Sequence, residues 1–240
     1  MATIAATGDI HSPKFLDDFR IAMRSVESST IDLFLLAGDL ILRGGIENLA
    51  GVLAVFEDNG ICCPIIGCFG NEEYSEIRDQ MKIVAGNRIK FLDDSSTLLQ
   101  VGSLNVGIVG SQGSLDLPTP WQAENIPGIE EVYSQRISRL SGILGRLVAD
   151  VRILLTHYPP TYRVLKGERR TFYPYIGSQK CERILAVGRV TFAVCAHAHM
   201  GIPFAVAKGV PVYNVSLPAA HRITLIDVKE PIISDALRQE

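Results

Sequence analysis

The sequence lacks any hydrophobic run that could cross a membrane as a helix. Its longest apolar stretches, residues 31–37 and 60–67, are much shorter than the about 20 residues that a spanning helix needs. The first residues also lack the basic region and the long apolar region of a secretory signal. We therefore expect a cytoplasmic protein that has no membrane partner.

Cysteine is scarce, and the number of cysteines is odd. The chain has Cys62, Cys63, Cys68, Cys181 and Cys195. Most of them lie in apolar runs, and the adjacent Cys62 and Cys63 would be hard to pair with each other. We expect buried thiols in a reducing compartment, because neither a disulfide framework nor a zinc ribbon fits this spacing.

An excess of positive charge is also missing. The 23 basic and 26 acidic residues give a formal net charge of -3. The overall composition therefore gives no support to a nucleic-acid partner, although a local basic stretch leaves one open. Hydrophobic residues make up 47% of the 240 residues, which indicates a folded chain with a sizeable core rather than a disordered one.

The first half of the chain alternates short apolar runs with helical patterns. The apolar runs predict three buried strands, at residues 3–7, 31–37 and 61–68. Ser12-Pro13 is typical of a helix start, with Ser12 as the N-cap and proline in the first turn. A second helix is expected over 46–57, where Asn59-Gly60 ends it. This alternating order predicts a parallel sheet with helical crossovers.

The second half introduces antiparallel pairing. Residues 96–111 predict a hairpin with its turn at Gly102-Ser103. Apolar residues at helical spacing predict a helix over 129–148, and the Gly-, Pro- and Ser-rich stretch 111–128 before it predicts a loop. Further strands are expected at residues 151–156, 190–195, 210–215 and 222–228. No linker composition divides the chain, so we expect a single domain over residues 1–240.

Polar side chains that commonly bind metals follow the ends of the predicted strands. They are Asp9, His11, Asp39, Asn71, His157, His197 and His199. Sites in open α/β sheets collect at the carboxyl ends of the strands, so these residues can converge although they are far apart in sequence. Four of the five histidines belong to this set, which favours a shared role over separate structural ones.

The ligand types indicate which ions such a site would hold. Nitrogen and oxygen ligands without thiolates suit manganese, iron or zinc. Seven ligands are too many for one tetrahedral ion, but they suffice for two ions that share a carboxylate. Two ions about 3.5–4 Å apart serve displacement at phosphorus, because they hold its oxygens and lower the pKa of bound water. We therefore expect two divalent or transition-metal ions as cofactors.

These stretches resemble the motifs of the calcineurin-like metallophosphoesterase family, which are D-x-H, G-D, G-N-H-[DE], H and G-H-x-H. In this chain they read, in order, Gly8-Asp9-Ile10-His11, Gly38-Asp39, Gly70-Asn71-Glu72-Glu73, Thr156-His157-Tyr158-Pro159-Pro160 and Ala196-His197-Ala198-His199. The resemblance covers roughly residues 3–227. It implies an α/β fold, a four-layer α/β/β/α sandwich with two mixed sheets.

The same resemblance implies how the ligands are divided between the ions. One metal would be bound by Asp9, His11 and His199. The other would be bound by Asn71, His157 and His197. Asp39 would bridge the two.

Glu72 is the main departure from the family pattern, because the family has a histidine at this place. That histidine helps to bind phosphate and to protonate the leaving oxygen. Glu72 could be the catalytic general acid if burial kept it protonated, and otherwise it would repel a phosphate dianion. A surface position without a role in catalysis is the open alternative. Ala196, in place of the motif glycine, is a smaller departure that a negative φ would allow.

Basic residues near the site are candidate substrate contacts. The stretch 38–44 resembles the G-D-x-x-D-R-G motif of phosphoprotein phosphatases, except that Leu42 replaces the acid. Arg43 could therefore bind the phosphate, although an ordinary surface arginine is the alternative. The segment 161–175 mixes basic and aromatic residues just after His157, and we interpret it as a loop or small cap. Its basic residues, Arg163, Lys166, Arg169 and Arg170, fit either a solvated loop or a lid over the substrate.

The sequence therefore predicts a metal-dependent phosphoesterase whose substrate is a phosphoester. A metal-bound hydroxide would attack phosphorus, and Glu72 favours phosphodiesters over monoesters because a diester carries less negative charge. One alternative is a binding scaffold that is catalytically weak or inactive, as resemblance to the small retromer subunit would allow, since that subunit also lacks the motif histidine. A nuclease of the same family is another alternative, and it would need a basic groove.

Overall fold

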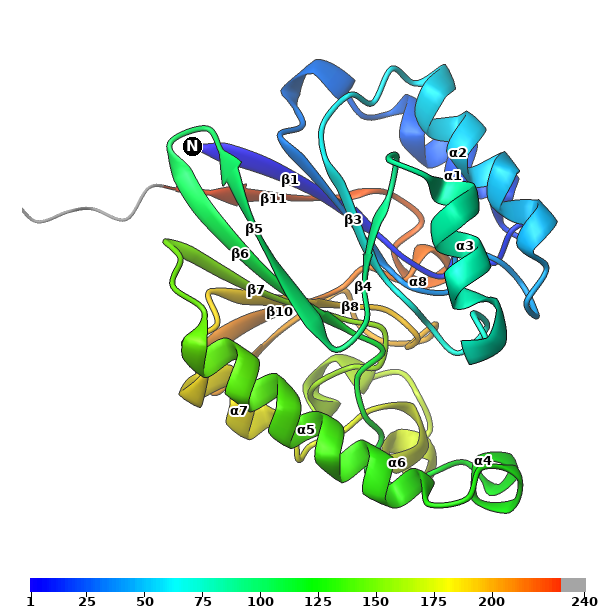
Figure 1. Ribbon diagram of the computed structural model, residues 1–240, viewed down its shortest axis with the longest axis vertical. Coiled ribbons are helices and arrows are strands. Elements are labelled where there is room, and N and C mark those ends of the chain that lie inside the picture. The colour runs from blue at the N-terminus through cyan, green and yellow to red at the C-terminus, as the bar shows by residue number, and fades with distance from the viewer. Residues whose placement is uncertain (230–240) are drawn as a thin grey trace, which may run out of the picture.

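The computed structural model describes residues 1–229 and contains two β-sheets that pack face to face (Figure 1). The first sheet has, from edge to edge, β11 (Thr224–Val228), β1 (Ala2–Thr7), β2 (Leu33–Ala37), β3 (Ile65–Cys68) and β4 (Lys90–Leu92). The strands β1 to β4 are parallel, and β11 pairs with β1 in the antiparallel sense. This sheet is therefore mixed, with a parallel centre.

The second sheet is also mixed. Its order is β5 (Ser95–Val101), β6 (Leu104–Ser111), β7 (Val151–Thr156), β8 (Phe192–Cys195), β10 (Val210–Asn214) and β9 (Phe204–Ala207). The central strands are parallel, whereas the edge strands β5 and β9 are antiparallel to their neighbours. The predicted hairpin at 96–111 is confirmed, and Gly102 allows its turn because φ is +57° there.

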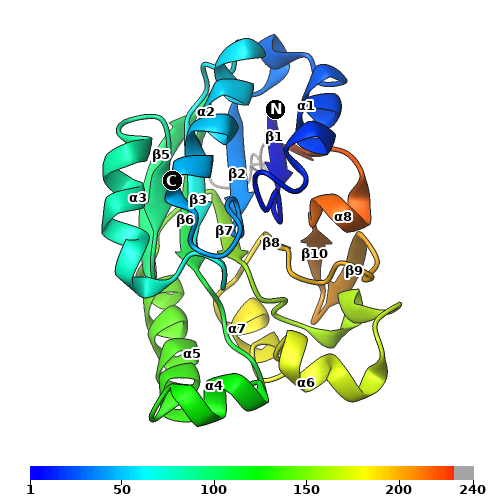
Figure 2. The ribbon, with the colours of Figure 1, turned by 90° about the vertical axis from the view of Figure 1, so that its right-hand side faces the viewer.

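Alternating side chains place the central strands between two apolar layers. Ile4 and Ala6 of β1 pack against the second sheet, whereas Ala5 faces the helices α1 (Leu16–Arg24) and α2 (Leu49–Asp58). The helix α3 (Arg78–Ala85) completes this outer layer. The helices α5 (Ile129–Arg146) and α7 (Glu182–Val187) cover the other sheet in the same way. Figures 1 and 2 show the resulting α/β/β/α order, which confirms the predicted sandwich.

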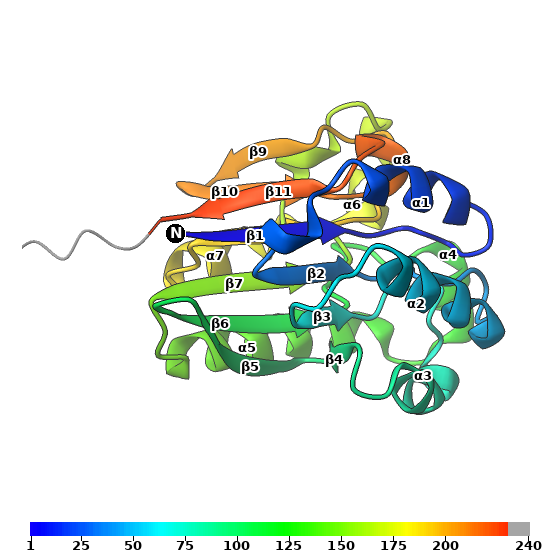
Figure 3. The same cartoon turned by 90° about the horizontal axis from the view of Figure 1, so that it is seen from above.

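The strand direction brings the candidate residues together. Figure 3 shows that β1, β2, β3 and β7 run toward the same edge of the sandwich. Both sheets therefore present the carboxyl ends of parallel strands, and the loops that follow them, at one side of the molecule.

Short helices occupy the connections. They are the 3₁₀ turns η1 (Ser28–Thr30), η2 (Ile46–Asn48), η3 (Ser75–Ile77), η4 (Tyr162–Leu165) and η5 (Arg170–Phe172), and the helices α4 (Pro120–Asn125), α6 (Tyr173–Ile176) and α8 (Leu217–Ala220). The segment 161–175, predicted as a loop or small cap, is thus built from η4, η5 and most of α6.

The predicted helix start at Ser12-Pro13 is wrong. Residue 12 forms a bridge with Ile41, and the Ser12 hydroxyl donates to the carbonyl of Asn48, so this stretch is tied to the loop after β2. The helix α1 begins only at Leu16. Contacts from outside the segment therefore outweigh the local capping pattern.

The predicted loop 111–128 contains the helix α4, which the Gly and Pro content concealed. Thr119 caps it, because Thr119 Oγ accepts the N–H of Gln122 while the Gln122 side chain accepts the N–H of Thr119. The elements β4, α3, α7 and β9 were not predicted either. The strand β3 begins at Ile65, four residues later than expected, since Pro64 cannot donate to the sheet.

Two further expectations concern membranes and cysteines. No helix in residues 1–229 is both long enough and apolar enough to span a bilayer. All five cysteines are free thiols, as expected. The expectation that they are buried is wrong for Cys62, which is exposed, and only partly right for Cys63. Both lie in the coil before β3, outside the sheet, so their side chains are not fully covered by the neighbouring layers.

Candidate metal centre

The candidate ligands lie in the loops that directly follow the parallel strands. Asp9 and His11 follow β1, Asp39 follows β2, Asn71 follows β3, His157 follows β7, and His197 and His199 follow β8. Asp9, His11, Asp39 and His197 have φ values of 56°, 43°, 52° and 68°. Residues other than glycine rarely adopt this left-handed conformation, and where they do it commonly marks a functional turn. These turns aim the side chains back into the gap between the sheets.

One group of ligand atoms comes from Asp9, His11 and His199, which lie within 4.8 Å of one another. The Nε2 atoms of His11 and His199 are 3.4 Å apart. Asp9 Oδ2 lies 3.3 Å from His199 Nε2, and it also accepts the backbone N–H of His197 at 2.8 Å. Asp9 Oδ1 is buried and has no hydrogen-bond partner. A free carboxylate oxygen and two imidazole nitrogens therefore converge on one point.

The second group comes from Asp39, His157 and His197, whose ligand atoms also lie within 4.8 Å of one another. His157 Nδ1 is 2.9 Å from the carbonyl oxygen of Ala37, so it carries the proton and donates it there. His157 Nε2 lies 3.0 Å from Asn71 Oδ1 and 3.1 Å from His197 Nδ1. In neutral His157 this nitrogen therefore has only a lone pair, which can accept a hydrogen bond or bind a cation.

Asp39 belongs to the second group and also faces the first. Its Oδ2 atom is 3.4 Å from His157 Nε2 and 3.8 Å from His11 Nε2. Its Oδ1 atom accepts the backbone N–H of Glu72 at 2.8 Å. The carboxylate is therefore fixed by one oxygen, while the other oxygen faces a nitrogen from each group.

Burial affects the two aspartates differently. Burial raises the pKa of Asp39 well above its ordinary value, and the nearby charges of Glu73 and Asp9 raise it further. Burial also opposes ionisation of Asp9, but its hydrogen bond with His199, and the positive charge that His157 and His199 carry when protonated, outweigh burial, so the pKa of Asp9 is lowered. Without a bound cation, the ionised form of Asp39 is therefore disfavoured.

Three of the four histidines are neutral at ordinary pH. Burial lowers the pKa of His11 to about 4, and it also lowers the pKa of His157 and that of His197. For His199, burial acts in the same direction, but Asp9 and Glu168 outweigh it and raise the pKa. Neutral imidazoles are the form that binds metal ions.

The donor set fits two cations of the zinc, iron or manganese type. His197 Nδ1 and Asn71 Oδ1 each lie about 3 Å from His157 Nε2, so these three atoms are placed to bind one cation together. The orphaned oxygen of Asp9 makes the same point in the first group. Each group offers nitrogen and oxygen atoms and no thiolate.

Glu73 is a site residue to which sequence reasoning assigned no role. Its buried carboxylate accepts the backbone N–H groups of Asp39, Leu40, Ile41 and Gly70, at 2.8, 2.5, 3.2 and 2.6 Å. It therefore joins the loops after β2 and β3, which carry Asp39 and Asn71. The final [DE] of the G-N-H-[DE] motif could have indicated this position.

Close packing explains the small residues of the motifs. A Cβ atom on Gly70 would collide with the Asp39 side chain, and one on Gly8 would lie 2.7 Å from the Cβ of Ala196. Ala196 itself is not among the residues with positive φ, so the departure from the family glycine is allowed as expected.

Glu72 and Arg43 are placed differently from each other. Glu72 is partly buried, and its Oε2 atom accepts the backbone N–H of Arg43 at 2.6 Å. The Arg43 side chain is exposed and has no hydrogen bond or ion pair to any residue in the described part of the chain. The structure thus brings Glu72 to the metal groups but not the guanidinium of Arg43.

The two groups form the floor of an open cleft of about 360 Å³. The lining residues are His11, Asp39, Asn71, Glu72, His197 and His199, together with Glu168, Ile176 and Met200. The sequence analysis gave Glu168 no role, although it belongs to the segment 161–175, whose basic residues were candidate substrate contacts. Arg163, Lys166, Arg169 and Arg170 are all exposed, and none of them lines the cleft.

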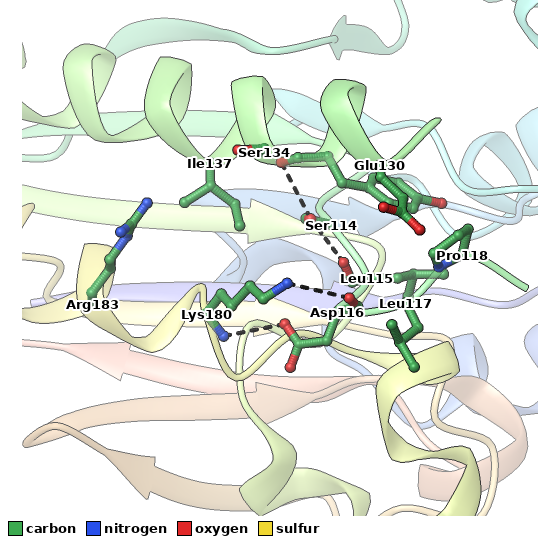
Figure 4. Close-up of a pocket in the computed structure, with 11 residues that line it drawn as sticks. Ser114, Leu115, Asp116, Leu117, Pro118, Glu130, Ser134, Ile137, Lys180 and Arg183 are labelled. Carbon is green, nitrogen blue, oxygen red and sulfur yellow. Dashed lines mark hydrogen bonds between the residues drawn. The ribbon is translucent and has the colours of Figure 1, made fainter. Parts of the chain in front are cut away.

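A smaller cavity of about 200 Å³ lies elsewhere, between α5 and the stretch that leads into α7 (Figure 4). The Asp116 side chain accepts hydrogen bonds there from Tyr162, Ser178 and the backbone N–H of Gln179. None of the candidate metal ligands lines this cavity.

Solved structures share the fold at low sequence identity. The phosphopantetheinyl hydrolase PptH from Mycobacterium tuberculosis has a TM-score of 0.63 at 15% identity, over 90% of this chain and 89% of that one. A dimetal phosphatase from Danio rerio has a TM-score of 0.61 at 14% identity, over 93% and 91%. At these identities the likeness establishes the fold alone.

No curated protein sequence matches this chain. A family model does, and it is described as calcineurin-like phosphoesterase and matches residues 2–201. That range includes every candidate ligand and both sheets' parallel strands up to β8. The chain therefore belongs to the calcineurin-like phosphoesterase family.

Proposed function

We propose that this chain is a two-metal phosphoesterase that hydrolyses phosphodiesters in preference to monoesters. The observation that carries the proposal is the position of Asp39 Oδ2, 3.4 Å from His157 Nε2 and 3.8 Å from His11 Nε2. One carboxylate oxygen is thus shared between two ligand groups, as a bridging ligand requires. Asp9, His11 and His199 would hold one ion, and Asn71, His157 and His197 the other.

Two bound cations would supply Lewis acidity and a water of lowered pKa. In the hydrolysis, a water oxygen bonds to phosphorus and the ester P–O bond breaks. The alcohol leaves with one proton of the water, and the product is a phosphate monoester. The side-chain amide N–H of Asn71 would donate to a phosphoryl oxygen, and Glu72 could give the leaving oxygen its proton only in its protonated form.

The preference for diesters rests on charge. Glu72 lines the cleft beside Asn71, and its carboxylate would repel a monoester dianion more than a diester monoanion. The hydrogen bond from the Arg43 N–H to Glu72 Oε2 supports the carboxylate form over the general acid. In the scaffold alternative, the cations would be bound without turnover.

The test is hydrolysis by purified protein loaded with manganese, zinc or iron. Bis(4-nitrophenyl) phosphate and 4-nitrophenyl phosphate are the paired substrates. We expect turnover of both, with the larger kcat/KM for the diester, and loss of both activities in Asp39→Asn. Two bound ions with no turnover of either ester would support the scaffold, and a preference for the monoester would contradict the charge argument.

A further inference from the structure

The substrate side of the metal cleft carries negative charge beyond that of the ligands. Two carboxylates that belong to neither ligand group line it, Glu72 and Glu168. Among residues 1–229, no lysine or arginine lines this cleft. A phosphate that enters the cleft therefore meets no fixed side-chain cation, and it passes two additional anions.

Glu168 is held firmly against the turn that carries His199. Its Oε1 atom accepts the backbone N–H of Met200 at 2.8 Å. The preceding Gly167 has φ of +119°, and a Cβ there would collide with the carbonyl oxygen of Met200. The backbone N–H of Ile202 donates to the carbonyl of Val164, 2.9 Å away, in the same segment. In Figure 2 this segment borders the loop after β8.

The two carboxylates flank different ligand groups. Glu72 follows Asn71, which faces His157, and it is fixed by the N–H of Arg43. Glu168 adjoins His199, which faces Asp9 and His11. Glu168 is half-buried and uses one oxygen for Met200, so the other oxygen is available to a ligand.

The remaining lining residues suit the hydrocarbon part of an organic cation. Ile176 and Met200 line the same cleft as Glu168, and Met200 is 69% exposed. An ammonium group next to Glu168 would regain the charge interaction that it loses with water, and its alkyl groups would contact these apolar side chains. A neutral group of the same shape would gain only the apolar contact.

We propose that Glu168 is a specificity-determining residue, which selects phosphodiesters that carry a positively charged ester group. The inference rests on the proposed function, since it names the substrate class of the same site. The phosphodiester anion would lie over the metal groups, and the ammonium group of one ester arm would lie against Glu168. The preference is a matter of binding, so it is expected mainly in KM.

The experiment compares two diesters that share one leaving group. These are 4-nitrophenyl phosphorylcholine and 4-nitrophenyl 3,3-dimethylbutyl phosphate, which replaces the quaternary nitrogen by carbon. For the metal-loaded protein we expect kcat/KM to be about two- to fivefold higher for the cationic ester, the scale of a partly exposed ion pair. The ratio should fall toward one as the salt concentration rises.

The variant Glu168→Gln keeps an acceptor for the Met200 N–H and removes the charge, so its ratio should fall close to one. The control Glu130→Gln removes a carboxylate at the other cavity and should keep the wild-type ratio. If wild type and Glu168→Gln turned over both esters with the same ratio of kcat/KM between the cationic and the neutral ester, this inference would be overturned. The proposed function would still stand. No turnover of either ester would overturn both.

The wild-type protein provides a second measurement that does not depend on how the variant folds. Tetramethylammonium should inhibit hydrolysis of the neutral diester competitively, and neopentyl alcohol, which lacks the charge, should inhibit it less. A wild-type preference of one or below for the cationic ester would overturn the assignment of Glu168.

Discussion

Glu73 holds Asp39 by its backbone, because Glu73 Oε2 accepts the Asp39 N–H at 2.8 Å while the Asp39 side chain turns toward the metal groups. The same Glu73 oxygen accepts the N–H of Gly70 at 2.6 Å, which precedes Asn71. A single buried carboxylate therefore ties the loop that carries Asp39 to the loop that carries Asn71. It binds no metal itself, yet it sets the geometry of both loops.

Replacing Glu73 by Gln should weaken folding and metal binding together. All four groups around the carboxylate are N–H donors, so the amide of glutamine would place its own N–H groups against two of them. We expect the free energy of unfolding to fall by about 3 kcal/mol, the scale for breaking a buried charged network. Urea titration of the metal-free protein measures this. Glu76→Gln, at an exposed site nearby, is the control, and an equal loss in both variants would contradict the account.

Replacing Asp39 by Asn should have opposite effects on metal-bound and metal-free protein. The pKa of Asp39 is raised in the folded state, so its contribution to stability is full below about pH 4 and is lost as pH rises through the folded-state pKa. The neutral asparagine avoids this cost. We expect metal-free Asp39→Asn to be more stable than metal-free wild type at pH 7, and equally stable near pH 4. Thermal melts in chelator at both pH values test this, and a less stable variant at pH 7 would contradict it.

Metal binding should strengthen as pH rises above 6.5. Burial lowers the pKa of His11 to about 4, so protons do not compete with metal there at neutral pH. The pKa of His199 is raised above its ordinary value of 6.5, so a proton occupies this ligand at lower pH and must leave when metal binds. Affinity should rise about tenfold per pH unit below that pKa and level off above it. Competition with a chromogenic chelator measures the profile; an affinity independent of pH would show that His199 is not a ligand.

The role of Glu72 is decided by comparing Glu72→Gln with Glu72→His on the two 4-nitrophenyl esters. If Glu72 donates a proton, Glu72→Gln should lower the rate on the order of 100-fold. If Glu72 acts only by repulsion, the rate should stay unchanged or rise, and Glu72→His should help the monoester more than the diester. The Arg43 N–H bond to Glu72 Oε2 leads us to expect the second pattern. Rates that no substitution changes would mean that Glu72 has neither role.

The candidate ligand set could be predicted from the sequence because each of these residues closely follows an apolar strand. Asp9, Asp39 and His157 follow runs whose period and length identify the strands, and the carboxyl ends of parallel strands must meet. Glu168 was not accessible in this way. It lies 11 residues after His157 in a segment of short turns, and only the packing of Gly167 against Met200 brings it to the cleft. Neither local propensity nor spacing encodes that contact.

The same distinction explains why the helix start predicted at Ser12 was wrong and why Glu73 was given no role. Ser12-Pro13 matches a helix start locally, but Ser12 is engaged by Asn48 and Ile41, which are remote in sequence. Glu73 looks like a surface acid next to Glu72, and its burial follows from four backbone donors on two loops. Short-range patterns predicted the strands other than β4 and β9 and the helices α1, α2 and α5, whereas long-range backbone contacts decided these two residues.

The most direct test of the central claim is anomalous diffraction from crystals of manganese-loaded protein. We expect two peaks per chain about 3.5–4 Å apart, the spacing of two-metal sites. One should be bound by Asp9, His11 and His199, the other by Asn71, His157 and His197, with Asp39 between them. A single peak, or two peaks that do not share Asp39, would contradict the account.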